Sequence, residues 1–84
     1  MSYRLLIANE VLEFLDGLRQ RERLLLRARF VQIAGFPENF SDFQERDSTG
    51  RSLDVNLCGR HAITYWTDFA DRDVKILRIT NADR

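Results

Sequence analysis

Residues 51–80 have the sequence RSLDVNLCGRHAITYWTDFADRDVKILRIT, in which short apolar runs alternate with turn-forming residues. Glycine, aspartate and serine favour tight turns between strands, and three such clusters occur, at 48–50, at 59–60 and at 70–73. Between them the apolar side chains recur with a period of two, which is typical of strands. We therefore predict four short strands after Asp42, connected as an antiparallel meander.

The turns also predict how these strands pair. A two-residue loop at 59–60, with glycine first, fits a tight hairpin, and a four-residue loop at 70–73 connects the next two strands. Opposed residues lie on the same face of a sheet, and a shift of one residue moves every side chain to the other face. The predicted pairs are Cys58–His61, Asn56–Ile63, Asp54–Tyr65 and Leu53–Trp66 across the first loop, and Phe69–Val74, Trp66–Leu77 and Tyr65–Arg78 across the second.

This register divides the meander into two faces. The first is apolar enough for helices to pack on it. Its members are Leu53, Val55, Leu57, Ala62, Thr64, Trp66, Leu77 and Ile79. The second mixes apolar, aromatic and ionisable side chains and has no element left to cover it, so we expect an open binding surface. Its members are Asp54, Asn56, Cys58, His61, Ile63, Tyr65, Phe69, Val74, Ile76 and Arg78.

The first half of the chain is predicted to begin with one strand and one helix. Residues 3–8 form a short apolar run with little helical period, which indicates a strand. Asn9 is a residue type that caps helices, and apolar residues then recur at helical spacing until Gly17, which is expected to close the helix.

A second helix is predicted from residue 20 to residue 34. Gly35 and Pro37 follow it, and both are usual signals for the end of a helix. Residues 36–41 are expected to form a loop. The apolar residues of this helix form a wide face: Leu24, Leu25, Leu26, Ala28, Phe30, Val31 and Ile33. The predicted order is therefore β-α-α-β-β-β-β, an α+β fold in which a helical hairpin packs on one face of a mainly antiparallel sheet.

Length and composition bound the architecture. With 84 residues, 44% of them hydrophobic and 31% charged, the chain can build one globular core, so residues 1–84 form a single domain. Cys58 is the single cysteine and no spacing of metal ligands occurs, so we expect neither a disulfide within the chain nor a metal or cofactor. No apolar run approaches the ~20 residues of a membrane span, and a cytoplasmic location is expected.

The formal net charge is zero, but the basic residues are unevenly divided between arginine and lysine. Zero net charge argues against strong non-specific attraction to nucleic acid, which grows with the number of phosphates neutralised. The basic residues are nevertheless twelve arginines and the single Lys75. Arginine offers a rigid fork of donors suited to phosphate or carboxylate, and the alternative for each arginine is a solvated surface position.

Taken in order, these segments resemble the RelE/ParE superfamily of bacterial toxins. The resemblance covers essentially the whole chain and rests on the opening strand followed by EVLEFLDGL (10–18), the second helix ending before Pro37, Gly50-Arg51, ITYWTD (63–68) and VKILRITNADR (74–84). It implies the toxin of a type II toxin–antitoxin system, of the kind that stabilises plasmids, neutralised by a cognate antitoxin. Antitoxin segments of this family wrap the toxin across its sheet or helical hairpin.

Within the family, one implied activity is that of a ribosome-dependent mRNA endonuclease, an mRNA interferase. Such a reaction needs a base, a cationic clamp on the phosphate and an acid close together. Arg78 occupies the place where family members carry a phosphate-binding arginine. The further candidates are Arg46, Arg51 and Arg60 as cations and His61 and Tyr65 as proton-transfer groups.

Other interpretations stay open for these residues and for the function. Arg78 could instead pair with Asp54 and stack on Tyr65 as a cross-strand ladder, and His61 could be a surface histidine. Nuclease members commonly carry a histidine or tyrosine after the last strand, and residues 80–84, TNADR, contain neither. The alternative function is a ParE-like inhibitor that binds a protein target such as DNA gyrase without catalysis. A third is a protein of this fold that has lost toxicity.

Overall fold

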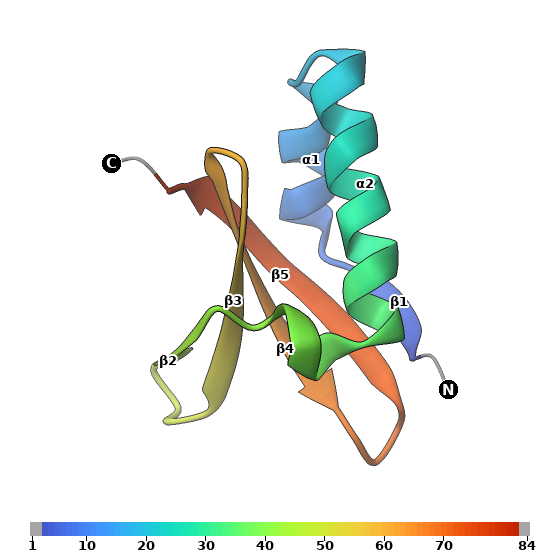
Figure 1. Cartoon of the computed structure of the whole chain (residues 1–84). Helices are drawn as coiled ribbons and strands as arrows, with labels where there is room; N and C mark the ends of the chain where they lie inside the picture. The colour runs from blue at the N-terminus through green and yellow to red at the C-terminus, as the bar shows by residue number, and fades with distance from the viewer. Residues whose placement is uncertain (1–2, 83–84) are drawn as a thin grey trace.

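The computed structural model describes residues 3–82 (Figure 1). Two helices and five strands follow one another in the predicted order, and a short 3-10 helix forms within the predicted loop. The elements are β1 (Arg4–Ile7), α1 (Asn9–Asp16), α2 (Gln20–Gly35), η1 (Pro37–Phe40), β2 (Phe43–Arg46), β3 (Ser52–Cys58), β4 (His61–Asp68) and β5 (Asp73–Asn81). Neither helix within residues 3–82 is long and apolar enough to cross a membrane.

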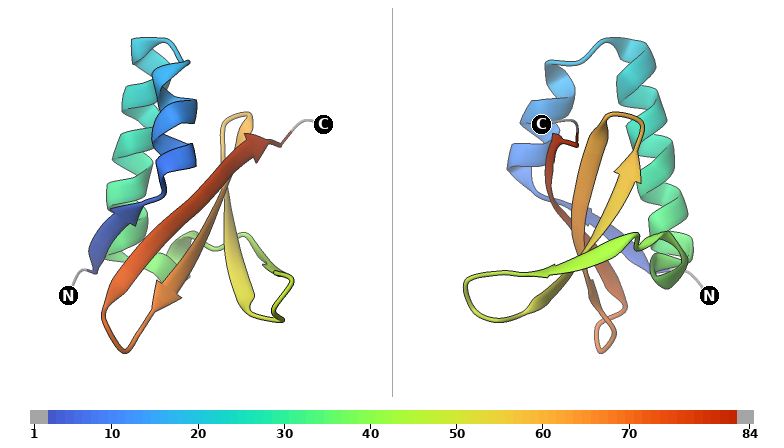
Figure 2. Two further views of the ribbon diagram at one scale, coloured as in Figure 1. Left: turned by 180° about the vertical axis from the view of Figure 1, so that it is seen from behind. Right: turned by 60° about the vertical axis from the view of Figure 1, so that its left-hand side comes forward.

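The sheet has the strand order β1-β5-β4-β3-β2. β1 pairs with β5 in parallel, and the remaining neighbours are antiparallel. Both helices lie on the same side of this sheet (Figure 2). The predicted α+β fold, with a helical hairpin on one face of a mainly antiparallel sheet, is confirmed.

The helical hairpin is closed by backbone and side-chain bonds at its turn. Gly17 ends α1 as predicted, whereas the cap at the start of α1 is Ala8, and Asn9 is already helical. The prediction of an Asn9 cap is therefore wrong, because the chain leaves β1 one residue earlier than the pattern suggested. At the other end, Arg23 of α2 donates hydrogen bonds to the carbonyl of Leu18 in the turn, at 2.9 Å, and to that of Leu15 in α1, at 3.2 Å, which joins the two helices.

The core lies on the face of the sheet opposite to the predicted one. Its members are Val11, Leu15, Leu26, Phe30, Ile33, Ala34, Ile63, Tyr65, Val74, Ile76 and Ile79. Of the face predicted to pack against the helices, Ile79 alone belongs to this cluster. Both faces of the meander are rich in apolar residues, so alternation could not tell which one carries the helices. Ile63 and Tyr65 fill more volume there than Ala62 and Thr64 would.

The other face is partly closed to solvent, although no helix covers it. Leu53 and Val55 are 1% and 2% exposed. The sheet is strongly twisted, and β2 and β3 run at a steep angle to β5 (Figure 1). This curvature folds the sheet over its own open face and buries residues there, as the right-handed twist of strands allows.

The register of the first hairpin is confirmed. That of the second differs by two residues beside its loop, where Val74 opposes Thr67 instead of Phe69, and by one residue at Arg78. Cys58 opposes His61 and Asp54 opposes Tyr65, as predicted. The next loop is 69–72 instead of 70–73, because Asp73 is held inside β5, where it opposes and ion-pairs with Arg4 of β1 at 2.8 Å. Such a contact between distant parts of the chain leaves no local signal in the sequence.

At Arg78 the one-residue difference in register and the exchanged faces offset each other. Tyr65 opposes Ile76, Thr64 opposes Arg78, and an irregularity in β5 at Leu77 separates the two pairs. Arg78 therefore lies on the open face, as predicted, whereas Tyr65 lies in the core. The prediction that the two residues lie side by side is wrong.

Asn56 was predicted on the open face, and this prediction is also wrong. Its side chain is buried and receives a hydrogen bond of 2.9 Å from Nη1 of Arg29 on α2. Its Nδ2 donates to the carbonyl of Phe40 at 2.9 Å, and the carboxylate of Asp42 accepts from the neighbouring backbone N–H of Leu57 at 2.7 Å. These bonds attach α2 to the segment from which β2 begins.

Candidate functional site

The open face of the sheet forms a groove with a volume of about 450 Å³. It runs across β2, β3, β4 and β5 on the side away from the helices. Its walls are Phe43, Glu45, Val55, Leu57, Ala62, Thr64, Arg78, Thr80, Asn81 and Ala82. The groove combines apolar walls with one arginine and one carboxylate.

Arg78 and Glu45 meet across this groove. Nη2 of Arg78 donates to Oε2 of Glu45 at 2.5 Å, and both side chains are about two-fifths exposed. β2 and β5 are separated by β3 and β4, and three strand spacings of about 4.8 Å would hold them about 14 Å apart in a flat sheet. The curvature of the sheet is what brings the two charged groups together. Within residues 3–82, the other donors of the Arg78 fork have no protein partner.

A cluster of cations surrounds Trp66 on the same face. The Arg51 guanidinium lies 4.5 Å from the centre of the indole ring, and Nζ of Lys75 lies 4.9 Å from it. Trp66 opposes Lys75 in the β4–β5 pair, and it shares its side of β4 with Thr64. The partly exposed indole ring and the two cations beside it provide a surface on which a nucleobase and its phosphates can both bind.

The tight turn between β2 and β3 positions Arg51. Asp47 accepts hydrogen bonds from the Thr49 hydroxyl at 2.7 Å, from two backbone N–H groups, and from Nε of Arg51 at 3.1 Å. The hydroxyl bond of Thr49, ahead of the backbone bonds and Arg51, lowers the pKa of Asp47 to about 2. Arg46 is engaged in the same hairpin, where it donates to the carbonyl of Gly50 at 2.7 Å.

Tyr65 lies outside this groove. Its side chain is fully buried in the core, and its hydroxyl donates a hydrogen bond of 2.5 Å to the carbonyl of Pro37. Burial, followed by the charges of Asp54 and Asp42, raises the pKa of this hydroxyl well above its ordinary value. A phenol that is shielded from solvent and holds its proton so firmly cannot exchange it with a bound substrate.

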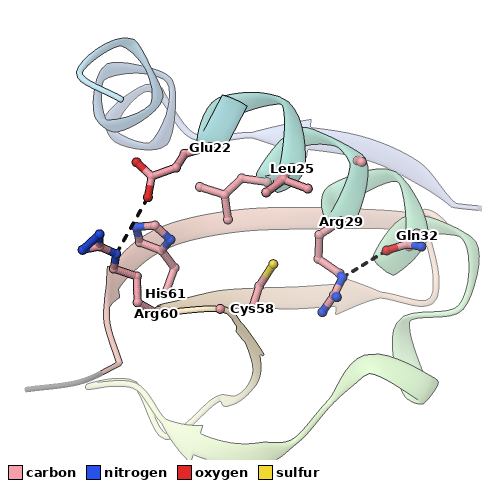
Figure 3. Close-up of a pocket in the computed structure, with 10 residues that line it drawn as sticks. Glu22, Leu25, Arg29, Gln32, Cys58, Arg60 and His61 are labelled. Atoms are coloured by element: carbon pink, nitrogen blue, oxygen red, sulfur yellow. Dashed lines mark hydrogen bonds and ion pairs between the residues drawn. The ribbon is translucent and has the colours of Figure 1, made fainter. Parts of the chain in front are cut away.

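His61 and Arg60 belong to a second groove, on the helical side of the sheet. The His61 ring packs edge-on against Phe14, with 5.6 Å between ring centres, and Nε of Arg60 lies 3.8 Å from Oε2 of Glu22 on α2. Figure 3 shows both residues facing α2 across this second groove. Of the six predicted residues, Arg78 and Arg51 therefore share the open face, and Arg46 is bound within the β2–β3 hairpin. The other three, Tyr65, His61 and Arg60, lie elsewhere.

Glu45 is the residue of the open groove that sequence reasoning missed. The turn at 48–50 was recognised, but the register of the strand before it was not worked out. Extending the pairing through this turn places Glu45 opposite Leu53 and Phe43 opposite Val55. That extension would have placed Glu45 on the Thr64 face, although not its contact with Arg78.

Three carboxylates also gather at the β4–β5 loop, where oxygens of Asp68, Asp71 and Asp73 lie within 4.8 Å of one another. Asp73 is bound by Arg4, whose hydrogen bond lowers the pKa of the carboxyl group. Asp68 lies 3.9 Å from Nζ of Lys75 and accepts the backbone N–H of Asp71 at 3.1 Å. These contacts with Arg4, Lys75 and the loop backbone account for the proximity of the three carboxylates.

The whole fold is similar to that of RelE toxins. No protein-family model and no curated protein sequence matches the chain. The archaeal RelE–RelB complex of Pyrococcus horikoshii OT3 contains a chain that superimposes with a TM-score of 0.82 at 20% identity, covering 100% of this chain and 99% of that one. The toxin–antitoxin complex RelBE2 of Mycobacterium tuberculosis gives a TM-score of 0.84 at 18% identity, covering 99% and 95%.

The intact RelBE toxin–antitoxin complex of Escherichia coli gives a TM-score of 0.74 at 16% identity and covers 99% of this chain and 100% of that one. The similarity thus extends over at least 95% of each of these chains. This chain therefore has the RelE-like fold, as the resemblance of its sequence implied.

Proposed function

We propose that this chain is the toxin of a type II toxin–antitoxin pair and that its open groove cleaves mRNA on the ribosome. The observation that carries the proposal is Arg78, which stands in a groove on the open face of a RelE-like sheet with most of its donors available. The similar solved structures are described as RelE toxins, several of them in complex with an antitoxin. A cognate antitoxin is accordingly the proposed partner.

The groove supplies two of the three groups that RNA cleavage needs. In this reaction the ribose 2′-oxygen attacks the phosphorus, the bond to the 5′-oxygen breaks, and a 2′,3′-cyclic phosphate and a 5′-hydroxyl are formed. Arg78 can bind the phosphate and stabilise its developing charge. Glu45, held beside Arg78, can accept the proton of the 2′-hydroxyl. Water then protonates the leaving 5′-oxygen.

The cluster around Trp66 would bind the neighbouring nucleotides. Stacking on an indole is tolerant of sequence because every base has a π-face, and Arg51 and Lys75 add positive charge beside it. With zero net charge the chain has little general attraction for free RNA. We therefore propose that the ribosome presents the mRNA, so that cleavage depends on translation.

An Arg78→Ala variant tests this function. Messenger RNA is incubated in a translating extract with the wild-type chain or the variant, and cleavage products are mapped by primer extension. Loss of the phosphate clamp should reduce cleavage by about 100-fold or more. Arg19→Ala is the matched control, because Arg19 is exposed and remote from the groove, and it removes the same charge. Equal cleavage by the Arg78→Ala variant and the wild type would refute the assignment.

The second candidate function is inhibition of a protein target without catalysis. The specific observation in its favour is that neither His61 nor Tyr65 reaches the groove. Among the described lining residues, therefore, no histidine or tyrosine can protonate the leaving oxygen. A supercoiling assay with purified DNA gyrase distinguishes it. Inhibition of supercoiling, with mRNA left intact in the translating extract, would replace the nuclease proposal by this one.

A further inference from the structure

Three aromatic side chains from distant parts of the chain gather at one end of the molecule. Tyr3 precedes β1, Phe36 follows α2 and Phe69 lies in the β4–β5 loop, and these segments meet at the lower right of Figure 1. The Tyr3 and Phe69 rings pack edge-on, with 6.1 Å between their centres. Tyr3 also lines a cavity of about 180 Å³ together with Phe36 and Glu38. We call these four residues and Arg72 the aromatic end.

Most of the apolar surface of the aromatic end is open to solvent. Phe36 and Phe69 are 63% and 58% exposed, although phenylalanine is among the residue types most often buried. Single apolar side chains are normal on a protein surface, whereas contiguous ones mark contacts with other molecules. Aromatic residues and arginine are also enriched at protein–protein interfaces. The aromatic end therefore has the composition of an interface.

Arg72 is held in a strained conformation at this end. Its φ of 58° lies in the left-handed region, and within residues 3–82 no other residue except glycine has a positive φ. Glycine would adopt this conformation without strain. The exposed guanidinium lies 5.0 Å from the centre of the Tyr3 ring, and it forms no ion pair in the described part of the chain. A side chain kept at such a cost indicates a function for Arg72 beyond the turn.

The charges of the aromatic end suit a second copy of the same surface. Arg72 lies in the loop that carries Phe69, whereas Glu38 lies beside Phe36. Glu38 is exposed and also lacks an ion-pair partner within residues 3–82, so the two charges do not meet in one chain. A two-fold axis near Tyr3 would bring each of them against its opposite in the other copy. A surface for nucleic acid would instead carry positive charge throughout.

Another exposed apolar surface, on the outer side of α2, is less suited to a second copy. Leu24, Leu25 and Val31 are 57%, 62% and 64% exposed there. The helix contains four arginines and one acid, and Arg21 and Arg27 are exposed. Two copies joined through this surface would place arginine against arginine, which is unfavourable. Self-association is therefore favoured at the aromatic end.

We propose that the aromatic end binds a second copy of this chain in a two-fold symmetric dimer. Phe69 of each copy would pack against Phe36 of the other, and Arg72 of each copy would pair with Glu38 of the other. This contact would leave the open groove accessible, because the groove extends toward the opposite ends of β4 and β5 from their connecting loop. The dimer does not depend on the proposed function.

Sedimentation equilibrium over a range of concentrations tests the dimer. The wild-type chain should reach the mass of a dimer at high concentration. Phe69→Ser should raise the dissociation constant at least about tenfold, whereas Leu12→Ser, which replaces an exposed leucine of α1, should leave it unchanged. A monomer at every concentration up to about 1 mM, or equal association of Phe69→Ser and the wild type, would overturn the proposal.

Exchanged charges test the two-fold pairing itself. Arg72→Glu and Glu38→Arg should each weaken self-association about tenfold, because each sets like charges against one another at both contacts. When the two variants are mixed, both contacts of the mixed dimer join opposite charges again. The mixture should therefore associate about as tightly as the wild type. Association of the mixture no tighter than that of either variant alone would refute this pairing.

Arg72→Gly separates a role in binding from a role in folding. Glycine adopts the φ of 58° freely, so the variant should keep the circular dichroism spectrum of the wild type. Its dissociation constant for the dimer should nevertheless rise about tenfold, because the pair with Glu38 is lost. Unchanged self-association of Arg72→Gly would show that the strained arginine serves the single chain, and the proposed interface would fall.

Discussion

Replacing Tyr65 with phenylalanine would test which face of the sheet carries the core. The Tyr65 hydroxyl donates to the carbonyl of Pro37 in a fully buried position. The variant keeps the ring but leaves that carbonyl without its side-chain donor, which typically costs about 1–3 kcal/mol. In a domain of this size each kcal/mol lowers the melting temperature by about 4–8 °C. We therefore expect a clear loss of stability without a change of fold.

Urea unfolding, followed by the fluorescence of Trp66, measures this loss. The midpoint should fall while the slope of the transition stays constant, because the surface exposed on unfolding hardly changes. Tyr3→Phe is the matched control, since the Tyr3 ring lies partly exposed against Phe69 and its hydroxyl has no hydrogen-bond partner in the described part of the chain. It should change the free energy of unfolding by less than about 0.5 kcal/mol. An equally small effect of Tyr65→Phe would refute the placement of Tyr65 in the core.

Three further results are expected. Glu45→Gln should lower the single-turnover rate of mRNA cleavage about 100-fold without weakening binding to ribosomes, and an unchanged rate would exclude Glu45 as the proton acceptor. The pKa of Asp47 is lowered from 3.8 to about 2, so Asp47 stabilises the fold above about pH 4 and loses this contribution as the pH falls toward 2. Asp47→Ala should therefore flatten the acid side of the stability profile, and parallel profiles of the variant and the wild type would contradict this. The pKa of Tyr65 is raised above 10.0, so stability present below pH 10 should decline at higher pH in the wild type more than in Tyr65→Phe; equal alkaline profiles would count against the buried phenol.

The parts of the fold that follow from neighbouring residues could be predicted from the sequence. The turn at Gly59 requires a positive φ, which the structure has at 61°, and this alone fixed the register of the first hairpin. The second loop was misplaced by one residue because Asp73 is held by Arg4, which lies 69 positions away in the chain. Two apolar faces were recognised, but which of them receives the helices depends on how large side chains pack in three dimensions.

The candidate site could be predicted only in part, because it also depends on contacts between residues that are distant in the chain. Arg78 was found through the resemblance of the last strand, and its place on the open face came from two errors that cancelled. Glu45 could not be linked to Arg78, because their contact depends on the curvature of the whole sheet and not on any local pairing. The exposure of Leu25 likewise became visible only when the helix had been placed against the sheet.

The bonds of Asn56 create a thermodynamic link between the two sides of the molecule. Arg29, which lines the second groove beside α2, holds the Asn56 amide, which in turn holds the segment leading into β2. A carboxylate that drew Arg29 away would loosen the chain just before Glu45. Because linkage is reciprocal, RNA bound on the far side would then lower the affinity for that carboxylate by the same factor.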